Sequence, residues 1–536
     1  MTAKNGRVYY NCTIREERGL WWKDGALAVK DGRVAACGER AGVMSQYGDW
    51  PQEDLKGATV LPGFNDAHLH FYQLGADLAA LDLSQVSSRE ELREKLELEI
   101  ESKKEGDILL GIRLNDSRFP EERLPERDFL DSLPTDDPVI LRRICYHAAA
   151  VNSKTLELAG IDRDKTDPEG GKIGRYSDGS PNGLLFDSAV DLVLEKLPEP
   201  GSSEIISTLD QAGKHLLQQG ITSVGIDDLA ALNRAEDMLA AYQGYLQATR
   251  IRPRLYLQQR IKNTADLEKL TKISRPTGEG NEELRYGPIK IMLDGSLGAR
   301  TAALTTSYLD DPGNKGDLLL EAAELQEILR KGYQQGFIPA IHAIGDRAIK
   351  TALEAIKAAA PKLESLHRSQ IIHCQLTRPA LIAELGRHQL WAVVQPVFLK
   401  SDRQMVKNRL DRELQQNCFA WHSLSRAGVQ LAFSSDAPIE PTNPLFGLEA
   451  SVSRQDWQGR PEQGFLPEER LSLDQALEFY SKAGARLSGE SQNKGSLGTG
   501  QLADFIVLEE DPRRLSPSDL ASLEVQQTYL AGKRVI

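Results

Sequence analysis

Residues 61–70 read LPGFNDAHLH: an apolar lead-in, a Pro-Gly turn signal, and then two histidines separated by one residue. Alternate side chains of a β-strand point to the same face, so His68 and His70 would project together from the end of a strand. Two imidazoles placed in this way suit a metal ion. The alternative is that both merely flank Leu69 on a half-exposed edge, and this stretch alone leaves both interpretations open.

Length and composition describe an ordinary globular chain. At 536 residues, it is too long for one simple core and long enough for a large barrel with smaller units beside it. The hydrophobic fraction is 40%, the charged fraction is 27%, and the net charge of −13 is spread without long blocks of one sign. This pattern argues against a nucleic-acid partner. The N-terminus has no apolar leader, and no uncharged run is long enough to cross a bilayer, so we expect a cytoplasmic protein without a membrane partner.

The cysteines argue against a cysteine-based metal site. Five of them, Cys12, Cys37, Cys145, Cys374 and Cys418, are scattered, odd in number and free of CxxC spacing. This spacing fits neither a disulfide framework nor a zinc–cysteine site. A metal would therefore need histidine, carboxylate or a modified lysine.

Both ends of the chain have the texture of short strands joined by turns. The first sixty or so residues contain alternating segments such as RVYYNCTI and GALAVKDGRVAACG, with Asp-Gly turn signals. The C-terminal segments GSLGTGQLADFIVLEEDP and EVQQTYLAGKRVI look alike. The two ends are therefore candidates for one shared sheet structure.

Between the ends, amphipathic helical stretches that end in Gly precede short apolar runs. The candidate buried parallel strands are TVLPGFNDAHLH, ITSVGIDD, RPRLYLQQR, PIKIMLDG, IPAIHAIGD, SQIIHCQL, LWAVVQPVF and VQLAFSSDAP. Eight such units predict an α/β fold, a (β/α)8 barrel of the TIM type, over residues 61–484. The stretch from about 76 to about 200 is far too long for a connection between the first two strands, so we interpret it as an inserted subdomain.

Metal-binding residue types occur at the C-terminal ends of these strands, where barrel enzymes carry their chemistry. The first strand ends in His68 and His70, the fourth carries Lys290, the fifth His342, the sixth His373 and the eighth Asp436. Four of the nine histidines fall at these few positions, which random placement would rarely produce. This distribution favours a metal site over the alternative that His68 and His70 merely flank Leu69 on a half-exposed edge.

The order HxH, Lys, His, His, Asp along the strands resembles the amidohydrolase superfamily. The strings LPGFNDAHLH, KIMLDGSLGARTAAL, HAIGDRAI and SSDAPIEPTNPLFGLEASVSR resemble its YtcJ-like branch, whose members are metal-dependent hydrolases of amide-type bonds. The resemblance covers nearly the whole chain, including CYHAAAVNSKTLELAGI and GSLGTGQLADFIVLEEDP. It implies a barrel flanked by a small β-sandwich built from both termini, here residues 1–60 and 485–536.

Two features depart from the pattern of this superfamily. Relatives usually carry Glu just before the sixth-strand histidine, where this chain has Ile372. A Trp-rich stretch expected near the start of the insertion is replaced by GIRLNDSRFP. The proposed metal ligands survive both changes, so any consequence falls on the substrate pocket.

The resemblance implies a centre with two divalent ions per chain, with zinc expected and iron or manganese as alternatives. In this set the first ion is held by His68, His70 and Asp436, the second by His342 and His373, and a carbamate formed from Lys290 and carbon dioxide joins them. A protonated lysine cannot bind a cation, whereas a carbamate offers two oxygens. The alternative is a solvated or salt-bridged Lys290, with nearby Asp294 as a partner.

The implied reaction is hydrolysis by a metal-bound hydroxide, with one ion polarising the substrate carbonyl. Asp436 would take the proton of the hydroxide and pass it to the departing amine. The alternative for Asp436, within SSDAP, is a helix N-cap or turn residue. Its place after an apolar run on the last strand favours the catalytic role.

His147, Arg300 and Tyr72 are further candidates for substrate binding. His147, in CYHAAAVNS, would reach the site from the insertion and bind the substrate carbonyl, whereas its alternative is a structural histidine. Arg300 and Tyr72 come just after strands that carry candidate metal ligands, so they could line the substrate pocket. The alternative is that both are simply loop residues. The expected partner is a small-molecule substrate, and because dimers are common in this superfamily, a homodimer is a further expectation.

Three functions follow from these observations. The leading one is hydrolysis of a linear amide, such as an N-acyl or N-formyl compound. A cyclic-amide hydrolase or a deaminase on the same barrel is the second; deaminases of this superfamily typically show an HxxE pattern, which neither HAIGD nor HCQLT contains. The third is a non-catalytic scaffold or regulatory relative, which loses weight because such proteins usually lose ligands and this chain retains the whole set.

Overall fold

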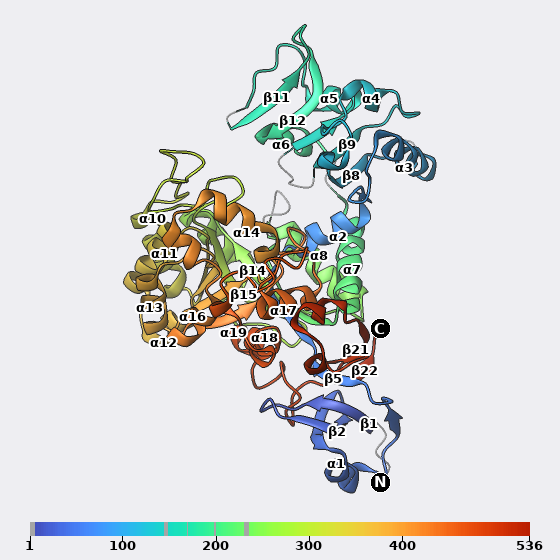
Figure 1. The fold of residues 1–536 in the computed structure, drawn as a ribbon, viewed down its shortest axis with the longest axis vertical. Coiled ribbons are helices and arrows are strands. Elements are labelled where there is room, and N and C mark those ends of the chain that lie inside the picture. Colours follow the sequence, from blue (N-terminus) through green and yellow to red (C-terminus); the bar gives the residue numbers. More distant parts are fainter. Residues whose placement is uncertain (1–5, 105, 144–147, 169, 198–199, 230–234) are drawn as a thin grey trace. The chain divides into compact units, whose positions relative to one another are not determined.

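In a computed structural model, the chain forms two units (Figure 1). One combines residues 1–72 with 212–536, and the other comprises Gln73–Gln211. The insertion was predicted at about 76 to about 200. The structure describes residues 6–104, 106–143, 148–168, 170–197, 200–229 and 235–536.

A sheet of eight strands is the centre of the larger unit, in the order β19-β18-β17-β16-β15-β14-β13-β6. Its strands are β6 (Phe64–Leu69), β13 (Ile221–Ile226), β14 (Arg254–Arg260), β15 (Leu284–Met292), β16 (Pro339–Ala343), β17 (Gln370–His373), β18 (Trp391–Val394) and β19 (Gln430–Phe433). All neighbours in this order pair in parallel. Each of the eight predicted runs forms one of these strands, which confirms the predicted strands.

The sheet nearly closes into a barrel. The backbone N–H of Asp436 donates to the carbonyl of His68 at 3.0 Å, and that of His70 donates to the carbonyl of Ala437 at 2.8 Å. These bonds join the chain after β19 to the end of β6. Because all strands run in parallel, their C-terminal ends share one rim, where His68, His70 and Asp436 lie.

Helices connect successive strands of the barrel (Figure 1). They include α8 (Ala235–Ala248), α9 (Thr264–Ile273), α10 (Ala322–Gln334), α11 (Asp346–Ala359), α12 (Leu363–Arg368), α13 (Pro379–Arg387), α14 (Phe398–Arg409), α15 (Arg412–Gln416) and α16 (Trp421–Ala427). Local chemistry sets their ends: the Asn263 side chain caps α9 by accepting from the Asp266 N–H, and α16 ends at Gly428 with a φ of 99°. No described helix is long and apolar enough to cross a membrane.

A second sheet of the larger unit contains strands from both ends of the chain. Its order is β22-β21-β20-β5-β1-β2-β3, from β1 (Gly6–Arg15), β2 (Trp21–Lys30), β3 (Arg33–Glu39), β5 (Thr59–Pro62), β20 (Phe505–Leu508), β21 (Val525–Leu530) and β22 (Lys533–Arg534), while β4 (Gln52–Asp54) pairs with β1. The ring of Phe505 stacks on Tyr529 at 4.2 Å and meets Tyr9 edge-on at 5.1 Å. The two ends therefore share one sheet, as their texture predicted, and the division into a two-sheet sandwich stays a prediction.

The smaller unit has a six-stranded mixed sheet of its own, in the order β11-β12-β10-β9-β8-β7. Its elements are β7 (Leu81–Asp82), α3 (Arg89–Ser102), β8 (Leu109–Leu114), α4 (Arg127–Asp131), β9 (Val139–Arg143), β10 (Ala148–Val151), α5 (Ser153–Ala159), β11 (Gly171–Arg175), β12 (Pro181–Asp187) and α6 (Ser188–Leu194). Separate apolar clusters form its core, one around Leu92 and Leu109 and one around Ile140 and Leu185. Along the chain, the borders between the two units fall within α2 (Phe71–Ala79) and α7 (Ser202–Gln218).

Candidate metal centre

The histidines of the HxH motif point at one carboxylate. The Nε2 atoms of His68 and His70 lie 3.2 and 3.5 Å from Oδ1 of Asp436. His68 is fully buried, and the Asp436 side chain is 9% exposed. The two imidazoles therefore converge, as their alternate positions on a strand predicted.

Hydrogen bonds at the opposite ring nitrogens fix which atom of each imidazole faces the site. The Nδ1 atom of His68 lies 3.0 Å from Oε1 of Gln258, and the Nδ1 atom of His70 lies 3.1 Å from the backbone oxygen of Asp227. Both partners are acceptors, so each Nδ1 carries the proton. The Nε2 lone pairs are then directed at the site, which is the arrangement that metal-ligating histidines require.

A second histidine pair adjoins the first. The Nδ1 atom of His342 lies 2.9 Å from Nε2 of His373, while Nδ1 of His373 lies 2.8 Å from Oε1 of Gln395. The rings of His68 and His373 are 5.9 Å apart between centroids. Ligand atoms of His68, His373 and Asp436 all lie within 4.8 Å of one another. The two histidine pairs therefore form one cluster.

Lys290 lies inside this cluster, near the end of β15. Its side chain is 1% exposed, and its Nζ is 3.2 Å from Nε2 of His68. The same Nζ is 3.2 Å from Oδ2 of Asp227, whose side chain is fully buried. Lys290 is therefore an ion-paired residue of the cluster and not a surface lysine.

The sequence alternative that paired Lys290 with Asp294 is wrong about the partner. Asp294 is fully buried, and its oxygens accept hydrogen bonds from backbone N–H groups of three residues, Ala303, Ile344 and Gly345. These bonds tie the chain after β15 to the chain after β16. The Asp294 carboxylate is therefore occupied by the backbone, and the contact of Lys290 is with Asp227.

Burial keeps most of these histidines neutral. It lowers the pKa of His68 to about 4, reinforced by the charge of Lys290, and it lowers the pKa of His373 to about 3. The pKa of His342 is also lowered well below its usual value, by burial and by His373. For His70, burial is outweighed by the contact with Asp436, which raises its pKa. Neutral imidazoles have the free lone pair that a metal needs.

The residues present fit a divalent cation. Burial raises the pKa of Asp436, but its contacts with His68 and His70 outweigh this and hold that pKa well below the usual range, so the carboxylate is charged. Its Oδ1 is buried and has no hydrogen-bond partner among the described residues. Together with the four imidazoles of the cluster, this charged oxygen makes a set of nitrogen and oxygen ligands that suits zinc, iron or manganese.

The backbone is strained at two of these positions. His373 has a φ of 75° and Asp436 a φ of 60°, and Cys374 next to His373 has a φ of 46°. Left-handed backbone at residues other than glycine costs about 1–3 kcal/mol and concentrates at functional sites. His373 is the last residue of β17 and Asp436 comes shortly after β19, so both strained positions lie at the C-terminal rim of the barrel.

Comparison with known proteins supports the same conclusion. The sequence model of the amidohydrolase family matches residues 53–536. The chain belongs to the amidohydrolase family. The putative amidohydrolase YtcJ of Bacillus subtilis (strain 168) is 33% identical over 512 residues, which are 95% of this chain and 95% of that protein. The resemblance to YtcJ-like metal-dependent hydrolases is thereby confirmed.

Two further relatives of this amidohydrolase bear on its chemistry. The N-substituted formamide deformylase of Arthrobacter pascens is 27% identical over 525 residues, covering 95% of this chain and 94% of that protein. The crystal structure of an uncharacterized metal-dependent hydrolase from Pyrococcus furiosus is 28% identical, with a TM-score of 0.76, and the match covers 95% of this chain and 99% of that one. Family and neighbours together support a metal-dependent hydrolase.

The three candidate substrate-binding residues of this amidohydrolase have different surroundings. The backbone N–H of Tyr72 donates to Oδ2 of Asp228 at 2.7 Å. The guanidinium of Arg300 pairs with both oxygens of Asp310, at 3.1 and 2.7 Å. His147 lies outside the described residues. A role in substrate binding stays a prediction for all three.

Sequence reasoning missed three residues that contact the candidate ligands: Gln258, Gln395 and Asp227. Gln258 and Gln395 bond to Nδ1 of His68 and of His373, and Asp227 contacts Lys290. All three stand at or just beyond the C-terminal half of a barrel strand. Their position near the C-terminal end of a strand was the signal that could have identified them. The prediction applied this signal only to histidines, to Lys290 and to Asp436.

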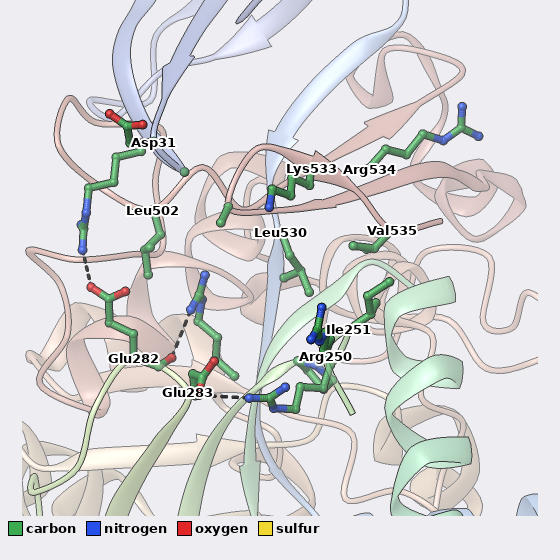
Figure 2. A pocket seen from close by; sticks show the side chains of 16 residues that line it. Asp31, Arg250, Ile251, Glu282, Glu283, Leu502, Leu530, Lys533, Arg534 and Val535 are labelled. Carbon is green, nitrogen blue, oxygen red and sulfur yellow. Dashed lines mark hydrogen bonds and ion pairs between the residues drawn. The ribbon is translucent and has the colours of Figure 1, made fainter. Parts of the chain in front are cut away.

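A separate cavity of about 480 Å³ lies at the opposite end of the barrel strands (Figure 2). Its lining includes Arg250, Ile251, Glu282 and Glu283, just before β14 and β15 begin, and Leu530 and Lys533 of the terminal sheet. None of the metal-ligand candidates lines it. This cavity is therefore distinct from the candidate metal centre.

Proposed function

We propose that the chain hydrolyses carbon–nitrogen bonds of linear amides, with N-formyl or N-acyl small molecules as substrates, at a centre of two divalent ions. The observation that carries the proposal is the convergence of His68 and His70 on Asp436, with a second histidine pair adjoining. Divalent ions bound there would supply a nucleophilic water at neutral pH and polarise the amide carbonyl. The formamide deformylase among the relatives favours N-formyl substrates.

The ligands divide by which atoms face each other. His68, His70 and Asp436 would hold the first ion, since the Nε2 atoms of the two histidines lie 3.2 and 3.5 Å from Oδ1 of Asp436. His342 and His373 would hold the second ion, since Nδ1 of His342 and Nε2 of His373 face each other at 2.9 Å. The glutamines Gln258 and Gln395 bond to His68 and His373, one in each set, and keep these imidazoles in the required tautomer.

Lys290 would join the two ion sites as a carbamate. Its ammonium first gives up one proton to water; the lone pair of the neutral amine then bonds to the carbon of carbon dioxide, a second N–H proton also passes to water, and the carbamate anion retains one N–H. The position of Nζ, buried and 3.2 Å from Nε2 of His68, supports this role. The two carbamate oxygens would supply further oxygen ligands to divalent ions, as a carboxylate does.

Asp436 moves the proton of the reaction. Its carboxylate accepts a proton from the attacking water and delivers it to the leaving nitrogen, while the carbonyl carbon gains an oxygen and the C–N bond breaks. The products are a carboxylic acid, formic acid in the case of a formamide, and an amine. The place of this carboxylate supports the role, since it is buried beside His68 and His70 at the proposed first ion.

A substrate panel tests the proposal. Zinc-loaded protein is assayed for amine release from N-substituted formamides, N-acyl amino acids and cyclic amides, and chelated protein and Asp436→Asn are run beside it. The matched control is Asp474→Asn, since Asp474 is 57% exposed and pairs with Arg15 of the terminal sheet. We expect amine release from linear amides that requires zinc, is lost in Asp436→Asn and persists in Asp474→Asn. Turnover of cyclic amides alone would favour the second function, and no turnover by loaded protein would contradict the proposal.

A further inference from the structure

Asp227 is a carboxylate at the metal centre that the family resemblance does not assign. It follows β13 directly and has a fully buried side chain. Its Oδ2 lies 3.2 Å from Nζ of Lys290, and its backbone oxygen accepts the hydrogen bond from Nδ1 of His70. One residue of the second strand therefore contacts two of the proposed metal ligands.

Arg260, the last residue of β14, holds this carboxylate in place. Its Nε lies 3.1 Å from Oδ1 of Asp227, and its Nη2 lies 2.5 Å from Oδ2. A two-point contact between a planar guanidinium and a carboxylate fixes the orientation of both groups. The carboxylate cannot rotate, so Oδ2 is held facing Lys290.

We propose that Asp227 is the positioning residue of Lys290: its Oδ2 accepts the N–H that Nζ retains after carbamate formation and so determines where the carbamate oxygens point. The inference rests on the function proposed above. A carbamate is planar, because its nitrogen lone pair is delocalised into the carboxylate. Fixing the direction of the single N–H therefore fixes the rotation about the Cε–Nζ bond and, with it, both oxygens.

The charges around Lys290 are consistent with this role. A carbamate beside Asp227 brings two anions together in a buried place, and the guanidinium of Arg260 and the bound cations offset them. The alternative interpretation is that Asp227 is itself a metal ligand, since its carboxylate lies within 4.8 Å of the candidate ligand atoms of His68 and His70. Both of its oxygens are engaged by Arg260, which favours the positioning role.

A double-mutant cycle separates a residue that acts through Lys290 from one that acts independently. The variants are Asp227→Asn, Lys290→Met and the combination, each prepared with bicarbonate and zinc. In the asparagine variant, Arg260 competes for a single oxygen, so the amide presents its NH2 group to Nζ and the N–H loses its acceptor. The readouts are zinc affinity by chelator competition and the carbamate carbon signal in NMR after labelling with ¹³C-bicarbonate.

We expect Asp227→Asn to weaken zinc binding by about tenfold or more, the range found for partners of metal ligands, and to diminish the carbamate signal. In the Lys290→Met background, the same substitution adds no further loss. The matched control is Asp228→Asn: this neighbouring carboxylate is also buried but bonds to Tyr242 and to the backbone of Tyr72, so zinc affinity stays within about twofold.

Two results would overturn the inference. Unchanged zinc affinity in Asp227→Asn is one, and an equal loss with and without Lys290 is the other, because it would make Asp227 a direct ligand or a support of the fold. A wild-type protein that binds no zinc would overturn the proposed function and the inference together, which distinguishes the two failures. If Asp227→Asn does not fold, Arg260→Gln frees the carboxylate to rotate and is expected to lower zinc affinity in the same direction.

Discussion

Gln258 offers a sharp test of how the first histidine is oriented. Its Oε1 lies 3.0 Å from Nδ1 of His68, and its Nε2 donates to the backbone oxygen of Ala67 at 3.3 Å. Because the amide nitrogen is used by a carbonyl, the oxygen must face the imidazole. Gln258→Met keeps the shape of the side chain and removes the acceptor, so the imidazole loses the bond that selects its tautomer.

The expected losses of stability and of zinc affinity in Gln258→Met follow from these hydrogen bonds. A buried donor left without an acceptor costs about 1–3 kcal/mol, and loss of such a partner typically weakens metal binding by about 10- to 100-fold. Gln259 supplies the matched control, since it is equally buried but bonds to the backbone oxygens of Arg275 and Gly287. Successive residues of a strand face opposite sides, so Gln259→Met breaks comparable bonds away from the metal centre.

The assay is zinc affinity by chelator competition, together with the free energy of unfolding of metal-free protein. We expect both variants to lose stability and only Gln258→Met to lose zinc affinity. Equal zinc affinities in the two variants, whether both unchanged or both reduced, would mean that Gln258 does not act through the tautomer of His68.

Three other predictions concern the ligands and the fold. His68→Ala and Asp436→Ala should give folded protein by circular dichroism that releases no amine; full activity in either would contradict its assignment. Lys290→Ala should lower zinc content, and short carboxylic acids should partly restore activity; no rescue with unchanged zinc would count against the carbamate. Burial, opposed by a hydrogen bond from Gln375, raises the pKa of Asp402 from 3.8 to about 6. Its ionisation therefore costs the folded state up to about 3 kcal/mol, and that much stability, present below about pH 4, is lost as the pH rises to about 6. Asp402→Asn should abolish this part of the pH dependence in urea unfolding, and an identical pH dependence in the variant would disprove it.

The sequence predicted the rim of the barrel well because its signals are periodic and local. Each buried parallel strand is a short apolar run, and the residue that ends the run lies at the shared rim. His342 and His373 are far apart in the sequence, but they lie at the ends of two neighbouring strands. Nδ1 of His342 is therefore only 2.9 Å from Nε2 of His373. The same reasoning located Asp436 and the HxH pair.

Contacts between side chains of different strands could not be predicted in this way. Proximity along the chain favoured Asp294 as the partner of Lys290, but its carboxylate is taken by backbone N–H groups after β16, and the actual partner, Asp227, comes from another strand. Gln258 and Gln259 are adjacent and identical in type, so nothing in the sequence distinguishes which one faces the histidines. Such choices depend on the register of neighbouring strands.

Elemental analysis of divalent metal per chain, on protein purified without chelators, tests whether this amidohydrolase holds a two-ion centre. We expect about two ions per chain, falling to about one in Lys290→Ala. About one ion in the wild type would leave Lys290 a plain ion-paired lysine and indicate a mononuclear mechanism. No metal, even after zinc is added back, would contradict a metal-dependent mechanism at this site.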